Sequence, residues 1–287
     1  MVSARTLVNG IMLAYDDVGS GPAVLLIHGF PLNRRMWRPQ VAILLAAGYR
    51  VIAPDLRGFG DSDVTDAACS MDLLADDLVE LLDHIGITQA AVVGMSMGGY
   101  LLFNLLERYP QRVQAAVFAV TRAVADDAEG RAGRRRLADD VVKFGPQVVA
   151  DRFLQLLFAP DTEAERPRLA EEVYGWMVAT ASSGLAGGLL AMGQRRDATA
   201  LLPLITAPAL AIGAEQDRAC PPEHLRAIAD AMPDCRLCII PGAGHLVNLE
   251  QPGDFNRTLL GFLREVLPTP LNLANLACDC SSDHSGA

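Results

Sequence analysis

Apolar positions fall into two kinds of pattern over the first 120 residues. Short, uninterrupted apolar runs occur at residues 23–28, 90–94 and 113–120. Such runs are typical of strands that are buried on both faces of a parallel sheet. Longer stretches between them place apolar residues at helical spacing, most clearly over residues 71–85. Strands and helices that alternate in this way predict a parallel sheet with helices on both faces.

Local signals indicate where some of these elements begin and end. Asn9-Gly10 is a dipeptide that favours positive φ at both positions, so it predicts the turn of a hairpin over residues 6–18. Ser70 is expected to cap the helix at residues 71–85, and Gly86 is expected to end it.

The pattern changes after Val120. The stretch from there to Leu202 has no run typical of a buried strand, and the alternation of strands and helices then resumes. Helix-like segments in the intervening stretch lie near residues 130–143, 146–158, 164–181 and 185–192. We expect residues 1–120 and 203–269 to form an α/β core. Residues 121–202 are expected to form a helical cap over the C-terminal edge of the sheet, where open α/β sheets bind ligands. Residues 270–287 are small and polar, which predicts a flexible tail.

The composition narrows the choice of partners. Hydrophobic residues make up 51% of the 287 residues, enough for a large core, and the net charge is −10. An acidic surface repels nucleic-acid phosphates and anionic lipid headgroups, so we expect neither nucleic acid nor a membrane as a partner. The N-terminus lacks the basic segment and apolar run of a signal peptide, and no stretch approaches the ~20 apolar residues of a membrane helix. We expect a cytoplasmic protein whose oligomeric state the sequence leaves open.

The six cysteines are sparse and are not spaced like a disulfide framework. Cys235 and Cys238 have the spacing of a redox or zinc motif, but residues three apart on a strand point to opposite faces. A zinc site that adds Cys278 and Cys280 is kept as an alternative. The main expectation is free thiols and no metal.

One serine lies where a strand is followed by a helix. The segment Gly94-Met95-Ser96-Met97-Gly98 follows one apolar run and precedes a helix that is expected up to Tyr109. The two glycines lack Cβ atoms, which would collide as strand and helix approach, so the turn can be tight and can expose the hydroxyl. The helix N-terminus adds N–H groups and positive potential beside Ser96 Oγ. This arrangement predicts a nucleophile; the alternative is a glycine-rich turn with an incidental serine.

A serine hydroxyl needs a base that accepts its proton. His245 follows the last expected strand, in the segment GAGH, and therefore lies at the same sheet edge as Ser96. Asp217 ends the preceding strand, and the chain order Ser, Asp, His fits a catalytic triad. Glu215 is the alternative carboxylate if that strand ends earlier. His28 is expected to brace its own loop.

Acyl transfer also needs N–H donors for the oxyanion. The segment HGFP, residues 28–31, leaves an early strand at the same edge, so the Phe30 N–H can point at the site. The Met97 N–H, directly after the nucleophile, is the second expected donor. Three nearby loop carboxylates are expected to stabilise turns: Asp55, Asp61 and Asp63.

Together these segments resemble the α/β-hydrolase superfamily. They are HGFP at 28–31, DLRGFGDSD at 55–63, GMSMGG at 94–99, GAEQD at 213–217 and GAGH at 242–245. The resemblance implies a mostly parallel eight-stranded sheet with an inserted helical cap. It also places the family's triad and oxyanion-hole roles on the residues named above. Haloalkane dehalogenases and epoxide hydrolases of this fold use aspartate at the position of Ser96, so serine argues against both.

The GMSMGG segment is most similar to the group of esterases, lactonases and perhydrolases. We therefore expect a carboxylesterase that cleaves small or medium esters through an acyl-enzyme, without a cofactor. An enol-lactonase or a perhydrolase with the same triad is one alternative. A ligand-binding receptor that reuses the fold is another.

RAGRRR, residues 131–136, is a dense basic run. It is short and lacks interleaved aromatic residues, so it does not indicate nucleic-acid binding. We expect a solvated face of a cap helix. Attraction of a carboxylate-bearing substrate is the alternative.

Overall fold

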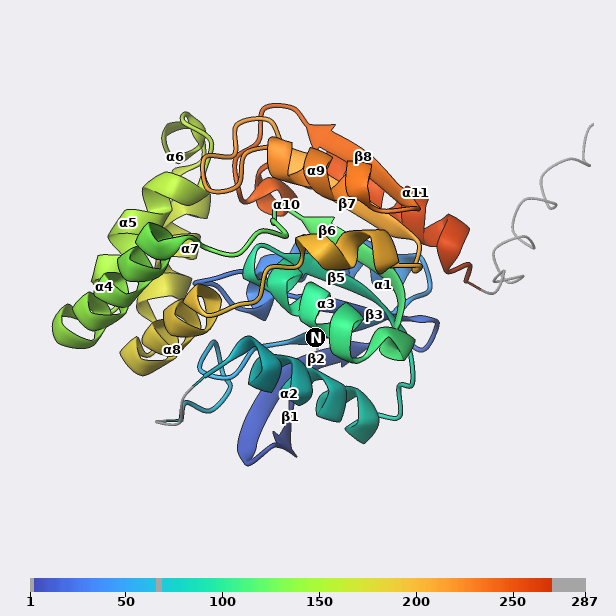
Figure 1. The fold of residues 1–287 in the computed structure, drawn as a ribbon, viewed down its shortest axis with the longest axis horizontal. Helices are drawn as coiled ribbons and strands as arrows, with labels where there is room; N and C mark the ends of the chain where they lie inside the picture. Colours follow the sequence, from blue (N-terminus) through green and yellow to red (C-terminus); the bar gives the residue numbers. More distant parts are fainter. Residues whose placement is uncertain (1–2, 66–68, 270–287) are drawn as a thin grey trace, which may run out of the picture.

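The computed structural model describes residues 3–65 and 69–269. Within them, eight strands form one sheet (Figure 1). The strands are β1 (Ser3–Val8), β2 (Ile11–Val18), β3 (Ala23–Ile27), β4 (Arg50–Pro54), β5 (Ala90–Met95), β6 (Val113–Ala119), β7 (Ala209–Ala214) and β8 (Cys235–Ile240). Their order is β1-β2-β4-β3-β5-β6-β7-β8, with antiparallel pairs at β1-β2 and β2-β4 and parallel pairs elsewhere. The predicted fold class is confirmed.

The hairpin predicted at residues 6–18 joins β1 to β2. Asn9 and Gly10 have φ values of 42° and 79°, the positive values that this two-residue turn requires. The hairpin begins at Ser3, earlier than predicted, because Ser3 still pairs with Asp16 of β2.

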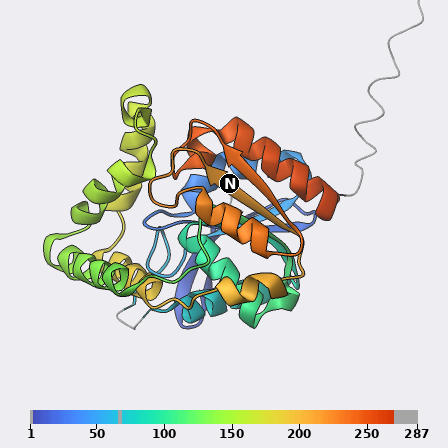
Figure 2. The same cartoon turned by 45° about the horizontal axis from the view of Figure 1, so that its top comes forward.

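Helices cover both faces of the sheet (Figures 1 and 2). They are α1 (Arg38–Ala46), α2 (Met71–His84), α3 (Met97–Arg108), α9 (Glu223–Ala231) and α11 (Pro252–Val266). Successive side chains of a buried strand point to opposite faces of the sheet. Leu26 of β3 packs in the cluster that contains α1 and α11, whereas Leu25 packs in the cluster that contains α2, α3 and α9. The predicted cap of α2 is confirmed, since Ser70 Oγ accepts from the Leu73 N–H at 3.1 Å.

A group of helices is inserted between β6 and β7 and lies beside the sheet (Figure 1). The group, called the cap below, comprises α4 (Ala128–Phe144), α5 (Gln147–Leu157), α6 (Thr162–Glu165), α7 (Pro167–Val178) and α8 (Ser182–Gly193). The helix expected near residues 164–181 is α7, but it begins at Pro167, and the short helix α6, which precedes it, was not expected. Pro167 lacks an N–H and starts the new helix at α7.

Short helices complete the structure: η1 (Arg34–Trp37), η2 (Pro110–Arg112), η3 (Thr199–Leu204) and α10 (Val247–Glu250). In the described part of the chain, no single helix has both the length and the apolar composition to cross a membrane. Taken together, α7 and α8 meet both criteria, but the two are bent by 92° where they join.

The parallel strands bring the predicted site residues to one edge of the sheet. Phe30 lies just beyond the end of β3, and Ser96 directly follows β5. Asp217 and His245 lie in the loops that follow β7 and β8. Because parallel strands present their carboxyl ends at a common edge, these loops face the same space.

Glu250, at the end of α10, fastens the cap to the loop that carries His245. The residue is buried, with 6% of its surface exposed. Its Oε1 accepts hydrogen bonds from the Ala159 N–H at 2.8 Å and from the Thr162 hydroxyl at 2.6 Å, both in the cap. Its Oε2 accepts from the Gly244 N–H at 2.9 Å. One carboxylate therefore holds the cap and the His245 loop in a fixed relation.

We expect Glu250→Ala to lower the free energy of unfolding by about 3 kcal/mol, because each buried donor left without an acceptor costs about 1–3 kcal/mol. Urea denaturation followed by circular dichroism measures this change. The control is Glu265→Ala, which removes an exposed partner of Arg236 and should shift the midpoint little. Equal small shifts in both variants would show that Glu250 does not anchor the cap.

Candidate active site

Ser96 occupies a sharp turn between β5 and α3. Its φ is 54° and its ψ is −112°, a backbone conformation that costs a non-glycine residue energy. The Ser96 N–H donates to the Ala119 carbonyl at 2.9 Å, and the Thr121 hydroxyl donates to the Ser96 carbonyl at 2.8 Å. These bonds to the end of β6 hold the strained residue in place.

The two glycines of the motif let three elements approach closely. A Cβ built on Gly94 would lie 2.3 Å from the Gly98 carbonyl oxygen, and one built on Gly98 would lie 2.3 Å from the Ile27 carbonyl oxygen. Any side chain at either position would push β5, α3 and β3 apart. The predicted steric role of these glycines is confirmed.

His245 and Asp217 form a buried hydrogen-bonded pair. Asp217 Oδ2 lies 2.7 Å from His245 Nδ1, and the carboxylate's other oxygen accepts from the N–H groups of Ala219 and Cys220, each at 2.8 Å. With Nδ1 facing the carboxylate, the second ring nitrogen, Nε2, remains for another partner. The alternative carboxylate, Glu215, instead accepts from the Gly242 N–H at 3.0 Å.

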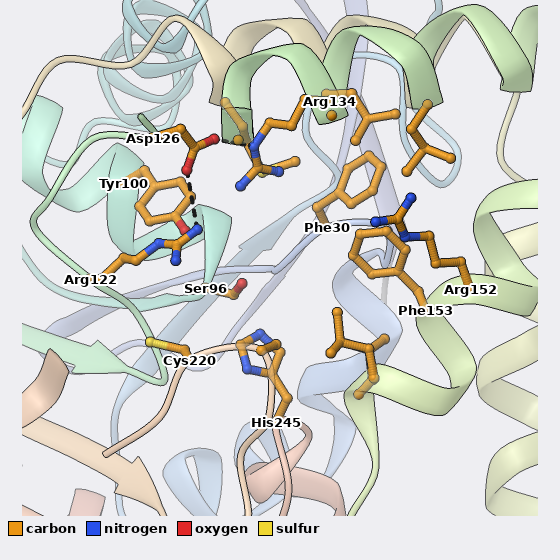
Figure 3. A pocket seen from close by; sticks show the side chains of 18 of the residues that line it. Phe30, Ser96, Tyr100, Arg122, Asp126, Arg134, Arg152, Phe153, Cys220 and His245 are labelled. Carbon is orange, nitrogen blue, oxygen red and sulfur yellow. Dashed lines mark hydrogen bonds and ion pairs between the residues drawn. The ribbon is translucent and has the colours of Figure 1, made fainter. Parts of the chain in front are cut away.

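Ser96 and His245 line one cavity of about 480 Å³ under the cap (Figure 3). The hydrogen bonds within residues 3–65 and 69–269 do not include one between the Ser96 hydroxyl and the imidazole. In enzymes without bound substrate such bonds are commonly long, and they shorten in the substrate complex. The structure thus brings the serine, histidine and aspartate predicted from the sequence to one site, with the Asp217–His245 contact already formed.

The predicted oxyanion donors lie beside the nucleophile. A Cβ built on Gly29 would lie 3.3 Å from Ser96 Cβ, so the loop that carries Phe30 runs against the serine. In the described part of the chain, neither the Phe30 N–H nor the Met97 N–H donates to a protein acceptor. The Phe30 ring lines the cavity and meets the Phe153 ring edge-on, with 5.2 Å between centroids.

His28 braces this loop, as predicted. Its Nε2 accepts from the Leu56 N–H at 3.0 Å, so the ring proton lies on Nδ1, which donates to the Gly29 carbonyl at 3.0 Å. Burial lowers the pKa of His28 and keeps the ring neutral, although Asp55 opposes this effect. Both ring nitrogens are occupied, and His28 does not line the cavity.

Of the three loop carboxylates expected to stabilise turns, Asp55 accepts from a backbone N–H of its own loop, whereas the side chains of Asp61 and Asp63 contact Arg34 and β2 instead. Asp55 accepts from the backbone N–H groups of Arg34 and Asp61, each at 2.8 Å, and also pairs with the Arg34 guanidinium. Asp61 pairs with the same guanidinium at 2.8 Å, and Asp63 accepts from the Met12 N–H at 2.9 Å. This network joins the loop after β3 to the loop after β4.

Apart from the basic run at residues 131–136, the charged wall of the cavity was missed by sequence analysis. Asp126 is buried and pairs with Arg122 at 3.1 Å, with Arg195 at 2.9 Å and with Arg134. Burial by itself raises the pKa of Asp126, but hydrogen bonds from Arg195 and Arg134 outweigh it and hold the pKa at about 2. The carboxylate is therefore ionised at neutral pH. The one available signal was position, because Arg122 lies just beyond β6 at the same sheet edge as Ser96.

The basic run at residues 131–136 is not wholly a solvated face. Arg131 and Arg135 do line an outer depression of α4 and α8. Arg134 and Arg136, however, line the cavity that holds Ser96. Arg136 is exposed, as expected of a solvated face, but Arg134 is half-buried and pairs with Asp126, so the expectation is wrong for Arg134.

The cysteines of β8 point to opposite faces, as predicted. Cys235 packs in the cluster of α2, α3 and α9, and Cys238 packs in the cluster of α1 and α11. The described cysteines, Cys69, Cys220, Cys235 and Cys238, are free thiols. Residues 3–65 and 69–269 contain no cluster of three or more His, Cys, Asp or Glu side chains able to hold a metal. Cys278 and Cys280 of the zinc alternative lie outside the described residues.

Known proteins share this architecture. The family model for the alpha/beta hydrolase fold matches residues 22–252. A thermophilic esterase from Thermogutta terrifontis is 35% identical, with a TM-score of 0.89 over 93% of this chain and 99% of that one. The enol-lactonase from Burkholderia xenovorans LB400 is 28% identical, with a TM-score of 0.85 over 91% and 99%. A bromoperoxidase from Bacillus anthracis is 27% identical, with a TM-score of 0.83 over 92% and 100%. The family match, which covers most of the chain, and the sheet with its helical insertion show that this protein belongs to the α/β-hydrolase fold family.

Proposed function

We propose that this protein is a serine hydrolase that cleaves small or medium carboxylic esters through an acyl-enzyme. The observation that carries the proposal is the 2.7 Å contact between Asp217 and His245, at a cavity that Ser96 also lines. The similarity to the esterase from Thermogutta terrifontis supports the same reaction class.

In the proposed reaction, Ser96 Oγ attacks the ester carbonyl while His245 Nε2 accepts its proton. Asp217 holds the imidazole in orientation and stabilises the imidazolium. The Phe30 and Met97 N–H groups bind the oxyanion of the tetrahedral intermediate. His245 then protonates the leaving alcohol, and a water molecule that it deprotonates releases the acid and restores Ser96.

The proposed substrate is a small molecule, and the proposed location is the cytoplasm. A cavity of about 480 Å³ is within the usual range of small-molecule sites. Free thiols at the described cysteines support a reducing compartment.

We expect Ser96→Ala to lower kcat for p-nitrophenyl butyrate by about 10⁴-fold or more, because the nucleophile of a serine hydrolase acts as a unit with its base. Release of p-nitrophenol measures the rate, and circular dichroism with a thermal melt checks that the variant folds. Wild-type turnover in a folded variant would refute the proposal.

A matched pair of variants tests the choice of carboxylate. Asp217→Asn is expected to lower kcat by about 10³–10⁴-fold, because the amide no longer fixes the productive tautomer of His245. Glu215→Gln keeps an acceptor for the Gly242 N–H and should retain the wild-type rate. The opposite ranking of the two variants would transfer the orienting role to Glu215.

Lactone hydrolysis or perhydrolysis with the same residues is the second candidate. The enol-lactonase and the bromoperoxidase of the same fold favour it. A panel of lactones, and peroxyacid formation from acetate and hydrogen peroxide, separate these reactions from ester hydrolysis. If esterase is the main activity, kcat/KM for the best ester exceeds the values for the lactones and for peroxyacid formation. A burst without sustained turnover on any substrate would instead indicate a ligand-binding receptor.

A further inference from the structure

The wall of the cavity beside Ser96 carries an excess of guanidinium groups. The cationic residues that line it in the described part of the chain are Arg122, Arg134, Arg136 and Arg152, and the anionic ones are Asp126, Asp127 and Glu129. In Figure 3, Arg122, Arg134 and Arg152 surround the space into which Ser96 and His245 point. An ester's scissile carbonyl needs none of these charges.

Asp126 does not neutralise the arginines around it. Its single negative charge is shared by Arg122, Arg134 and Arg195, all of which pair with it. Asp127 is engaged at the start of α4, where its Oδ1 accepts from the Gly130 N–H at 2.7 Å. With all three carboxylates counted against the four arginines that line the cavity, the wall keeps one net positive charge beside the nucleophile.

Arg122 is the arginine most directly tied to the nucleophile. Its neighbour Thr121 donates to the Ser96 carbonyl at 2.8 Å, and Arg122 lines the same cavity as Ser96. The Arg122 side chain is 27% exposed, so water solvates it only in part. A guanidinium has five N–H donors, and Asp126 together with the adjacent Tyr100 cannot accept from all of them.

A half-buried guanidinium with unused donors is suited to one kind of ligand group. Its planar fork matches the two oxygens of a carboxylate, and such charge-assisted bonds strengthen away from water. Arg134 offers a second guanidinium on the same side, while the rings of Phe30 and Phe153 supply an apolar wall for the carbon chain.

We infer that the substrate carries a carboxylate in addition to the scissile carbonyl, and that Arg122, with Arg134, binds this carboxylate. The substrate class is then an anionic ester or lactone, with the two groups separated by a short carbon chain. Arg136 and Arg152, which are exposed at the cavity, raise the local concentration of such an anion. This inference rests on the proposed hydrolase function and specifies its substrate.

Hydrolysis of monomethyl glutarate and of dimethyl glutarate, followed by pH-stat titration, tests the inference. The wild type should hydrolyse the anionic monoester with a kcat/KM at least about tenfold higher than that for the neutral diester. Hydrogen bonds to charged groups contribute about 1.5–3 kcal/mol, and about 1.4 kcal/mol corresponds to tenfold. In Arg122→Gln this preference should fall by about tenfold or more. Arg135→Gln removes the same charge from α4 outside the cavity and should keep the wild-type preference. Acetoxyacetate, which carries its carboxylate on the alcohol side, shows which half of the ester faces Arg122.

A binding measurement separates failure of this inference from failure of the proposed function. Calorimetric titration of Ser96→Ala should show tighter binding of the monoester than of the diester, and Ser96→Ala/Arg122→Gln should lose the difference. A wild type that hydrolyses both esters with equal efficiency, or an Arg122→Gln variant that loses both activities in proportion, overturns the inference and leaves the hydrolase standing. Absence of hydrolysis of every ester and lactone refutes the proposed function, whatever binds.

Discussion

The close crossing of β5 and α3 is the constraint on which the site depends. Gly94 and Gly98 let the two elements and the end of β3 approach until no Cβ fits between them. This crossing forces Ser96 into a conformation with positive φ, and bonds to the end of β6 hold it there. At this edge Val120, directly after β6, also has positive φ, at 42°, so the strain falls on Ser96 and on the strand end that holds it. The loops after β3, β7 and β8 leave the same edge of the sheet as Ser96 and therefore face the serine.

The position of the cap is coupled to the sheet edge that carries the site. Glu250 bonds both the cap and the loop of His245, and the Leu246 N–H donates to the Leu157 carbonyl at 3.0 Å. Arg218, next to Asp217, donates to the Phe158 carbonyl at 3.1 Å. The segment that follows α5 is thus attached to both loops that carry the histidine and the aspartate. A shift of this part of the cap would change the cavity wall and the acid-base pair together.

Sequence alone was enough for the features that depend on local patterns. Uninterrupted apolar runs identify buried strands, and the glycines around Ser96 indicate a tight turn from strand to helix without knowledge of any distant residue. The short helix α6 was missed because residues 163–168 are all exposed, so no apolar spacing indicates a helix there. The charged wall was missed for a different reason. Asp126 and Arg134 are close in the chain, but Arg195 follows α8, and the packing of α4 on α8 brings it to them.

An acidic protein with a cationic cavity raises the question of which charge an anionic substrate would experience. The net charge of −10 is spread over the whole molecule, and salt at physiological strength screens exposed charges beyond about 8 Å. The Arg122 guanidinium, in contrast, is partly shielded from solvent and lines the same cavity as the reacting serine. At the distance of a bound ligand, the local arginines outweigh the distant surface carboxylates, because Coulomb energy falls with separation and with the dielectric constant. The acidic surface and the proposed carboxylate-binding wall are therefore compatible.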